Sequence, residues 1–382
     1  MSSLAALETV AKNVTTGDGG NNWGAHKSRI VRTARGVFTV FTLDGGGYLA
    51  REWHLARKTD DDWEIVKQGV AGREPPHLLA GPDGTLYVIG WPDGQPHIWA
   101  GADTGDGLEW RDEAVRGRWS KTDWPYSAAA ISPHGEIAIV TSLGDKPGKF
   151  QWAHGVPFSE RWKSETFATD FRFAYVFPFA TERGLWFLGE RDVLWQSLGW
   201  KHPEGAFTYV FDGLRYWHTT DVRQGEFASG DLRDEPQTEE YPMVSCYQVD
   251  VYEDLRGRMH VLYNRRGAST SGKTIGCHLA MEKTGRILWD VALPQAAQWR
   301  MTQDLTGKFH LLMSQGSDLL VYSSQDEECR TLGEPARMPL GKTLSPYWYI
   351  AAPRNGSERK NHVDAAGLTS SGDLVYFRVN LT

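Results

Sequence analysis

A glycine placed directly before a short alternating apolar run recurs seven times along the chain, and this repeat constrains the fold more than any other feature. The glycines are Gly36, Gly84, Gly135, Gly184, Gly257, Gly307 and Gly372. In four of the six steps, successive copies are about 50 residues apart, a spacing typical of one four-stranded blade of a β-propeller and not of helical or leucine-rich repeats. The steps from Gly184 to Gly257 and from Gly307 to Gly372 are longer.

Each repeat has the same order: an apolar stretch, a polar turn with the glycine, an alternating strand, and a third strand rich in Trp or Phe. Because alternate side chains point to opposite faces, each blade must pack on two neighbours and the ring must close. We therefore predict an all-β fold, a seven-bladed β-propeller of four-stranded antiparallel blades, as a single domain over residues 1–382. The two long steps indicate insertions within blades, at about 201–240 and 324–342. The segments LAALETVAKNV and DLVYFRVNL, near the two ends of the chain, are expected to share the last blade.

Charge and cysteine content exclude several classes of protein. The 41 Lys and Arg residues against 48 Asp and Glu residues give a net charge of −7 without a long basic stripe, which argues against nucleic acid as a partner. Cys246, Cys277 and Cys329 lack metal-type spacing and are expected to be reduced packing thiols. No run approaches the roughly 18 apolar residues of a membrane helix. We expect a soluble, monomeric protein, cytoplasmic as the sequence stands or secreted if a signal peptide has been removed.

Tryptophan is the most frequent aromatic residue, with 17 Trp against 15 Phe and 14 Tyr. Indole rings stack on sugar rings, so tryptophans near strand ends and loops are candidates for a carbohydrate surface, while most of the others are expected to pack between strands. The candidates are Trp91, Trp99, Trp124, Trp195 and Trp348. Trp91 joins the predicted substrate-binding residues.

The innermost strand of each propeller blade starts or ends beside the central channel. Residues seven to ten before each repeat glycine are therefore expected to meet at one mouth, and they are His26, His77, Tyr126, Tyr175, Tyr247, Arg300 and His362. The loops after the second strands are expected to reach the same rim with His97, Arg191, Asn264, Arg265 and Arg266. Arginine pairs with carboxylates through two parallel hydrogen bonds, so the pattern favours a ligand that carries a carboxylate.

Two pairs in this set carry a family resemblance. His77 lies near the start and His97 at the end of the run PPHLLAGPDGTLYVIGWPDGQPH. Tyr175 and Arg191 lie in the same way near the start and at the end of the run AYVFPFATERGLWFLGER. The chain resembles the BNR-repeat seven-bladed propeller polysaccharide lyases, of the ulvan lyase and rhamnose–glucuronate lyase type. In that group two histidines on one blade and a Tyr/Arg pair on the next eliminate across a uronic acid. The resemblance implies a lyase with His77, Tyr175, His97 and Arg191 as its catalytic residues.

The chain departs from the family pattern at one blade. The blade of Gly135 stands between the histidine blade and the Tyr/Arg blade, whereas in the family these two blades are neighbours. Its own Tyr126 has Ser142 at the place where the pattern would put arginine. If Tyr126 is the true counterpart, the role of neutralising the carboxylate passes to another blade.

Elimination chemistry also suits these residue types by itself. The reaction removes a proton next to a carboxylate, so it needs a cation on that carboxylate, a base, and an acid for the leaving oxygen. We assign His77 and Tyr175 as base and acid in undecided order, and His97 and Arg191 to the carboxylate. The predicted substrate-binding residues are His26, Tyr126, Arg266, Arg300, His362 and Trp91. The expected substrate is an acidic oligosaccharide or glycoside.

Two other functions stay open. A sialidase-like glycoside hydrolase would use a Tyr nucleophile with several arginines, and a propeller without catalysis would bind carbohydrate or protein. No dissociable cofactor is expected, because no phosphate-binding loop or dinucleotide fingerprint is present. A divalent ion held by His26, His77, His97 and His362 is the alternative left open, and the expected site contains no metal.

Overall fold

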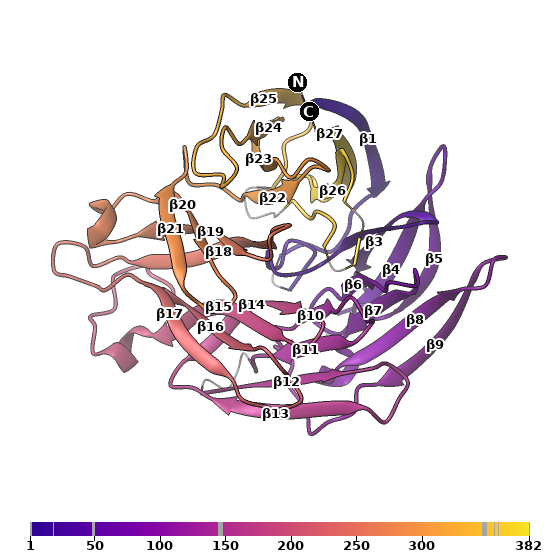
Figure 1. The fold of residues 1–382 in the computed structure, drawn as a ribbon, viewed down its shortest axis with the longest axis horizontal. Coiled ribbons are helices and arrows are strands. Elements are labelled where there is room, and N and C mark those ends of the chain that lie inside the picture. Colours follow the sequence, from indigo (N-terminus) through magenta and orange to yellow (C-terminus); the bar gives the residue numbers. More distant parts are fainter. Residues whose placement is uncertain are drawn as a thin grey trace.

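The computed structural model describes residues 2–17, 19–47, 50–143, 148–345, 350–354, 356–357 and 359–381. Its strands form seven antiparallel sheets arranged in a ring (Figure 1). Six sheets have four strands that follow each other in chain order, as meanders do. The described residues also form three single-turn 3-10 helices, η1 (Pro92–Gly94), η2 (Trp195–Leu198) and η3 (Ala268–Thr270).

The six meanders are blades 1 to 6, and each runs from its innermost strand outward along the chain. Blade 1 comprises β2 (Ile30–Thr33), β3 (Gly36–Leu43), β4 (Glu52–Lys58) and β5 (Trp63–Val70). Blade 2 comprises β6 (His77–Ala80), β7 (Leu86–Gly90), β8 (His97–Asp103) and β9 (Leu108–Ala114). Blade 3 comprises β10 (Ala128–Ile131), β11 (Ile137–Thr141), β12 (Lys149–Gly155) and β13 (Trp162–Ala168). Blade 4 comprises β14 (Arg172–Ala180), β15 (Leu185–Leu194), β16 (Tyr209–Thr219) and β17 (Ala228–Asp234). Blade 5 comprises β18 (Ser245–Glu253), β19 (Met259–Arg266), β20 (Ile275–Met281) and β21 (Ile287–Ala292). Blade 6 comprises β22 (Arg300–Gln303), β23 (Phe309–Gln315), β24 (Asp318–Ser323) and β25 (Ala336–Pro339).

Blade 7 joins the two ends of the chain, as the sequence predicted. Its sheet has the order β1-β27-β26, formed by β1 (Ser3–Ala11), β27 (Leu374–Asn380) and β26 (His362–Leu368). On the channel side Ala351 bridges to Ala366 and supplies the innermost, fourth layer of the blade. The N- and C-termini consequently lie side by side in Figure 1, and the seven-bladed, four-stranded propeller is confirmed.

In blades 1 to 6 the repeat glycines sit in the turns between the first and second strands, and in blade 7 Gly372 sits between the second and third, β26 and β27. Six of the seven have a positive φ, between 74° and 116°, which L-residues rarely adopt. Gly184 is the exception, and there a Cβ atom would lie 2.8 Å from the Thr219 carbonyl oxygen. The recurrent place of glycine in the repeat thus follows from backbone geometry at six turns and from close packing at the seventh.

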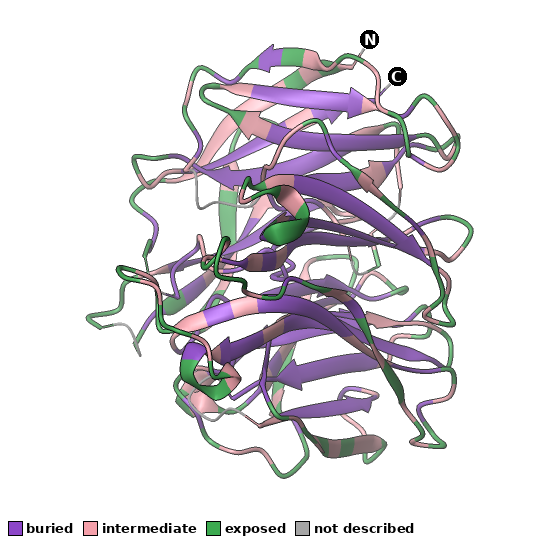
Figure 2. Cartoon of the chain, turned by 90° about the vertical axis from the view of Figure 1, so that its left-hand side faces the viewer, coloured by how far each residue is buried: buried purple, intermediate pink, exposed green. Residues whose placement is uncertain are grey.

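The cores lie between neighbouring blades, so that inner strands are buried and outer loops exposed (Figure 2). One core packs Phe150 and Trp152 of blade 3 against Phe173 and Phe187 of blade 4. Burying such large apolar side chains between sheets is the main favourable term in folding. The three cysteines are free and buried, in agreement with the prediction. In the described ranges, no helix has both the length and the apolar character that crossing a membrane requires.

Candidate functional site

Aromatic rings gather in tilted and edge-to-face contacts where the inner segments of blades 1, 3 and 4 meet. The ring centroid of Trp23 lies 4.9 Å from Trp124, 5.5 Å from Tyr126 and 5.8 Å from Tyr175, and the two tyrosine rings lie 5.2 Å apart. The Arg73 guanidinium covers Trp124. Tyr126 and Tyr175 have φ values of 44° and 49°, a strained conformation that turns both rings into the cluster. These rings, called the aromatic plug below, pack on one another.

A buried polar layer lies directly beneath the aromatic plug. The Lys27 ammonium donates to the Glu74 carboxylate at 2.6 Å and to the Ser127 hydroxyl at 2.7 Å, and it lies 3.3 Å from His77 Nε2. Glu74 also accepts hydrogen bonds from the Tyr126 and Ser127 backbone amides. Through these bonds the layer joins the inner chain segments of blades 1, 2 and 3 around one buried ion pair.

Two histidines of this layer stay neutral. Burial, followed by the charge of Lys27, lowers the pKa values of His26 and His77 well below 6.5. The two rings lie 6.4 Å apart, and His26 is only 4% exposed and His77 not at all. Burial also lowers the pKa of Lys27, against the opposing effect of Glu74. The floor of the channel therefore combines neutral imidazoles with one paired cation.

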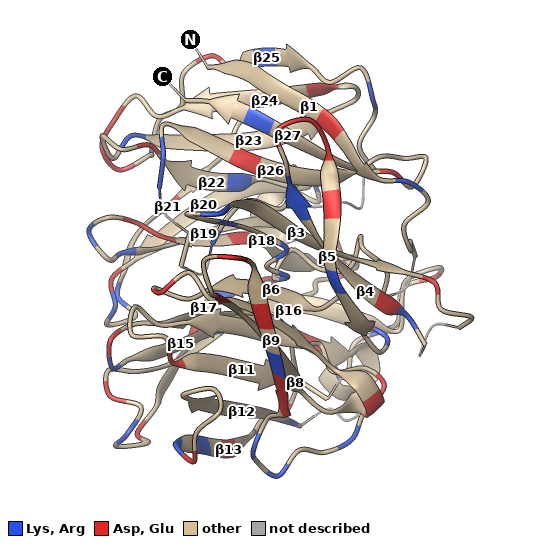
Figure 3. Cartoon of the chain, turned by 90° about the vertical axis from the view of Figure 1, so that its right-hand side faces the viewer, with Lys and Arg blue, Asp and Glu red and all other residues tan. Residues whose placement is uncertain are grey.

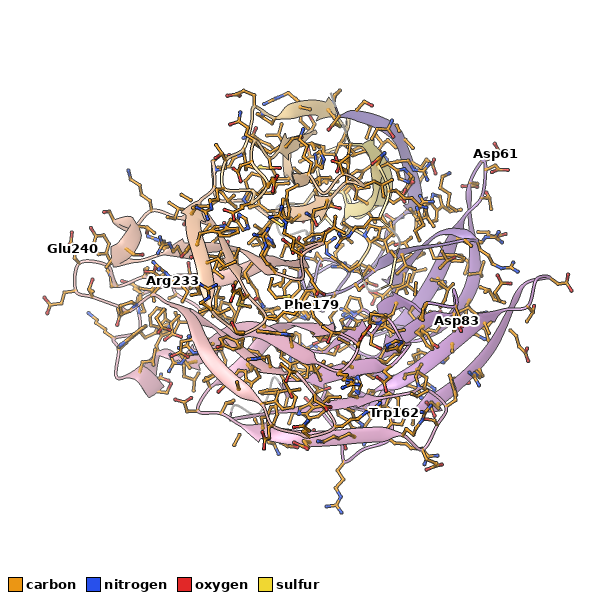
Figure 4. All side chains as sticks on the ribbon, in the orientation of Figure 1. Asp61, Asp83, Trp162, Phe179, Arg233 and Glu240 are labelled. Atoms are coloured by element: carbon orange, nitrogen blue, oxygen red, sulfur yellow. The ribbon has the colours of Figure 1, made fainter. Side chains whose placement is uncertain are left out.

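Beyond this floor the channel opens into a cavity of about 500 Å³, called the channel cavity below. All seven blades contribute to its wall, and Phe179, labelled near the centre of Figure 4, is part of it. A volume of this size suits a sugar-sized ligand. Its charged lining residues are Lys27, Arg32, Asp250, Glu253, Arg300, Arg354, Arg359, Lys360 and Asp364.

Buried carboxylates in the channel cavity each hold two guanidinium groups. Asp250 lies 3.1 Å from Arg300 and 2.8 Å from Arg354. Asp364 accepts hydrogen bonds from Arg32 at 2.7 Å and from Arg378 at 3.0 Å. At Asp250 and at Asp364, two arginines face one carboxylate, so each site has a net positive charge that a ligand can neutralise. On the side of the molecule drawn in Figure 3, acidic and basic residues are interspersed along strands and loops without a basic stripe.

The loop between the inner segment of blade 7 and β26 carries Arg354 and Arg359 across the channel mouth. Arg354 donates to the Met301 carbonyl of blade 6 at 2.6 Å, and Arg359 donates to the Glu253 carbonyl of blade 5 at 3.1 Å. On the opposite side, the Arg32 amide of blade 1 donates to the Ser357 hydroxyl at 3.0 Å. At Gly356, where φ is +93°, a Cβ atom would collide with the Ala80 carbonyl of blade 2. The described residues of this loop thus contact four blades.

His362 and Tyr252 supply groups that can exchange protons in the channel cavity. Burial, and then the cations Arg32 and Arg378, lower the pKa of His362 against the effect of Asp364. His362 Nε2 lies 3.7 Å from Asp364 and makes no hydrogen bond within the described part of the chain. Burial raises the pKa of Tyr252, whose phenolic oxygen accepts a hydrogen bond from the Gln303 backbone amide at 3.2 Å. His362 is therefore a neutral base, and Tyr252 a protonated acid.

The structure brings together only some of the residues that the sequence placed at one mouth. His26, His77, Tyr126 and Tyr175 are neighbours, and Arg300 lies close by, donating to the Ala25 carbonyl at 2.9 Å. Tyr247 instead contacts Asn264 at 3.2 Å within blade 5. His362 begins the second strand of its blade, not the first, and lines the channel cavity.

The predicted four-residue catalytic set is not assembled. His97 lies on the third strand of blade 2 and pairs with Asp112 at 2.8 Å, while Arg191 lies on the second strand of blade 4 and pairs with Asp212. Arg266 donates to the Gly272 carbonyl at 2.9 Å within blade 5. His97 and Arg191 thus pair with aspartates of their own blades, and neither lines the channel cavity. His77, with no exposed surface, is sealed in the buried layer.

Two of the tryptophan candidates, Trp91 and Trp195, are buried, and Trp99 and Trp124 are partly exposed. Trp91 donates to Thr141 at 3.1 Å, and Trp195 donates to the Phe207 carbonyl at 2.8 Å. Trp99 packs on Trp53 with centroids 5.1 Å apart, and Trp124 belongs to the aromatic plug. Trp348 lies outside the described residues.

Sequence reasoning missed Arg32, Tyr252, Arg354 and Arg359. Arg32 and Tyr252 lie late on inner chain segments, toward the end of the channel opposite the aromatic plug. Arg354 and Arg359 fall in RNGSERK, inside the elongated last repeat, and this basic cluster is the signal that could have found them. Over the described ranges, no group of three or more His, Cys, Asp or Glu side chains is arranged to hold a metal ion.

Comparison with known proteins supports the fold. No protein-family model and no curated protein sequence matches the chain. Among solved structures it is similar to a chain of the Mitotic Checkpoint Complex, with 10% identity, TM-score 0.52, and coverage of 98% of this chain and 94% of that one. The AfRom2 CNH domain aligns with 10% identity, TM-score 0.50 and 99% coverage of both chains. The α-L-arabinofuranosidase Arb93A from Fusarium graminearum aligns with 9% identity, TM-score 0.49, and coverage of 79% and 91%. At these identities the likeness extends to the fold alone.

Proposed function

We propose that the protein takes an acidic sugar into the channel cavity and cleaves a uronate-containing glycan by β-elimination. The observation that carries the proposal is the excess of guanidinium groups around a sugar-sized cavity in a protein of net charge −7. Arg32, Arg354 and Arg359 would bind the carboxylate, because arginine matches carboxylate geometry. The resemblance of the repeat to uronate-cleaving propellers points the same way.

In the proposed reaction His362 takes the proton from the carbon that bears the carboxylate. The arginines stabilise the negative charge that develops on the carboxylate as this C–H bond breaks. The electron pair forms a carbon–carbon double bond, the bond from the neighbouring carbon to the glycosidic oxygen breaks, and Tyr252 gives its proton to the leaving oxygen. The directions of the two pKa shifts suit these roles, since His362 is neutral and Tyr252 protonated near pH 7.

Hydrolysis is the second candidate, because Tyr252 has several arginines around it. The guanidinium carbons of Arg354 and Arg359 lie 5.0 and 5.6 Å from its ring centroid, a grouping that also suits a tyrosine nucleophile of the sialidase kind. A raised pKa keeps the phenol protonated, so it is less readily activated as a nucleophile and remains available as a proton donor. This favours elimination.

The test is incubation with uronate oligosaccharides while recording the ultraviolet absorbance of the unsaturated product and the number of reducing ends. We expect absorbance to rise, and His362→Gln to lower the rate by about 100-fold or more, as loss of a general base does. His97→Gln, which removes a histidine outside the channel cavity, serves as the matched control and is expected to leave the rate unchanged. New reducing ends without absorbance would assign hydrolysis. Loss of activity in His97→Gln instead of His362→Gln would reject the channel cavity as the site.

A further inference from the structure

A second hollow, of about 860 Å³, lies on the outer part of blade 4 and is independent of the channel cavity. We call it the blade 4 groove. It is lined by β15, β16 and β17, by Phe171 just before β14, and by the segment after β15 that carries Trp200. Arg233 of β17, labelled in Figure 4, marks this side of the molecule. The aromatic lining residues are Phe171, Trp200, Tyr216 and Trp217.

Asp212 in this groove has an unused acceptor. Its side chain is only 7% exposed, and its Oδ2 forms an ion pair with Arg191. Its Oδ1 is buried and accepts no hydrogen bond from any residue of the described ranges. A buried carboxylate oxygen without a donor is costly, since it has lost its water and gained no partner. A ligand with a hydrogen-bond donor would satisfy it.

Two other buried aspartates of the molecule show what such a side chain can hold. Asp250 and Asp364 are buried to a similar degree, and each is bound by two guanidinium groups, one on each oxygen. Asp212 has one guanidinium and lies in an open groove instead of a closed core. The missing donor is therefore best matched by a second guanidinium that comes from outside the chain.

Charge and aromatic surface in the groove fit the same ligand. Five carboxylate residues line it against two arginines, and Arg215 is already held by Asp231 and Asp234 at 2.7 Å each. The carboxylate residues are Asp170, Asp212, Asp231, Asp234 and Glu235. Glu235 Oε1 lies 3.4 Å from Arg265 and 3.7 Å from Arg233, so this carboxylate is already paired within the chain. Aromatic faces beside carboxylates attract cations, and guanidinium stacks on them.

We propose that the blade 4 groove binds an arginine side chain of a basic segment in a partner polypeptide. A polypeptide fits better than a free small cation because Ser229, Gly230 and Asp231 of β17 line the groove, and β17 is the outermost strand of its sheet. An outermost strand offers backbone groups to a second chain. Phe207, in the same insertion as Trp200, is 70% exposed and adds an apolar contact of the kind found at interfaces.

The experiment compares two peptides by calorimetry on the full chain: a short blocked peptide with one arginine, and the same peptide with citrulline, which has the same shape without the charge. We expect saturable binding of the arginine peptide, and binding at least about tenfold weaker for the citrulline peptide, as loss of a charge-assisted pair implies. Asp212→Asn is expected to weaken binding of the arginine peptide by a similar factor. Asp318→Asn, which alters a strand-borne aspartate paired with Arg337 on blade 6, is the matched control and is expected to have no effect.

The outcomes separate the alternatives. Equal affinity for the two peptides, or unchanged affinity in Asp212→Asn, would overturn the proposal. Agmatine that binds as tightly as the peptide would assign the groove to a free guanidinium compound and overturn the polypeptide partner. If Asp212→Asn does not fold, as a thermal melt would show, the comparison of arginine and citrulline on the unmodified protein still decides. Failure of uronate cleavage would leave this result unaffected, because the groove shares no lining residue with the channel cavity.

Discussion

At the scale of single residues, the pair of Lys27 and Glu74 decides how the inner segments of three blades meet. Neither side chain has more than 2% exposure, and each is fully engaged: Lys27 has acceptors in Glu74 and Ser127, and Glu74 accepts two backbone amides besides. Removing one member of such a pair leaves the other buried and uncompensated, which costs far more than the pair contributes.

Glu74→Gln is therefore expected to lower the free energy of unfolding by about 3–5 kcal/mol, because it leaves Lys27 buried without a counterion. Urea denaturation followed by circular dichroism measures this loss. Glu282→Gln, which disturbs the exposed pair of Glu282 and Arg286, is the control and is expected to give no measurable change. A Glu74→Gln protein as stable as the unmodified one would show that the buried pair does not hold the blades.

At the scale of elements, β1 is what closes the ring. It pairs with β27 over nearly its whole length, so that Leu7 stands opposite Phe377 and packs on the core of blade 7. Leu7→Asp is expected to lower the free energy of unfolding by about 2–4 kcal/mol, since it places a charge against this core. Ala5 is exposed at a bulge in the same strand, and Ala5→Asp is expected to stay within about 0.5 kcal/mol of the unmodified protein. Thermal melts compare the two, and equal melting temperatures would contradict the closing role of β1.

The elements also show how far sequence can lead. The glycine repeat and the alternating strands predicted seven blades and the closure by both ends, because period and turn geometry are local properties. The same reasoning brought His26, His77, Tyr126 and Tyr175 together, since one residue per inner segment meets at the channel. It failed for His97 and Arg191, whose strand within the blade decides which way they point. Arg354 lies in a loop without a counterpart in other repeats, so no period could place it.

At the scale of the whole molecule, buried ionisable groups couple folding to pH. Five histidines are no more than 4% exposed and have lowered pKa values: His26, His77, His260, His278 and His310. Burial is the main cause in each, and it lowers the pKa of His278 to about 3. Two buried carboxyl groups act the other way: burial raises the pKa of Glu190 well above its usual value, and raises that of Asp192 to about 7.

The sign of the pH dependence follows from which state binds more protons. As pH falls below about 6.5 the unfolded chain protonates its histidines, while the lowered pKa values delay protonation of these five in the folded protein, so each contributes stability that is lost as pH falls. For His278, with a pKa of about 3, the loss is about 1.4 kcal/mol per pH unit. Glu190 and Asp192, whose pKa values are raised, bind more protons in the folded state than in the unfolded chain and act in the opposite direction. The free energy of unfolding is therefore expected to fall as pH drops from about 6.5 to 5, because the five histidines outnumber the two carboxyl groups, and this fall begins well above the range in which ordinary carboxylates titrate.

Urea denaturation at pH 7, 6 and 5, at constant ionic strength, checks this slope. His278→Gln removes one of the five imidazoles and is expected to reduce the slope by about 1.4 kcal/mol per pH unit, whatever it does to stability at pH 7. His97→Gln is the control, because His97 is partly exposed and pairs with Asp112 outside the core. A free energy of unfolding that is constant between pH 7 and 5 would contradict neutral buried imidazoles, including His26 and His77 in the floor of the channel. A slope that His278→Gln leaves unchanged would contradict a neutral His278.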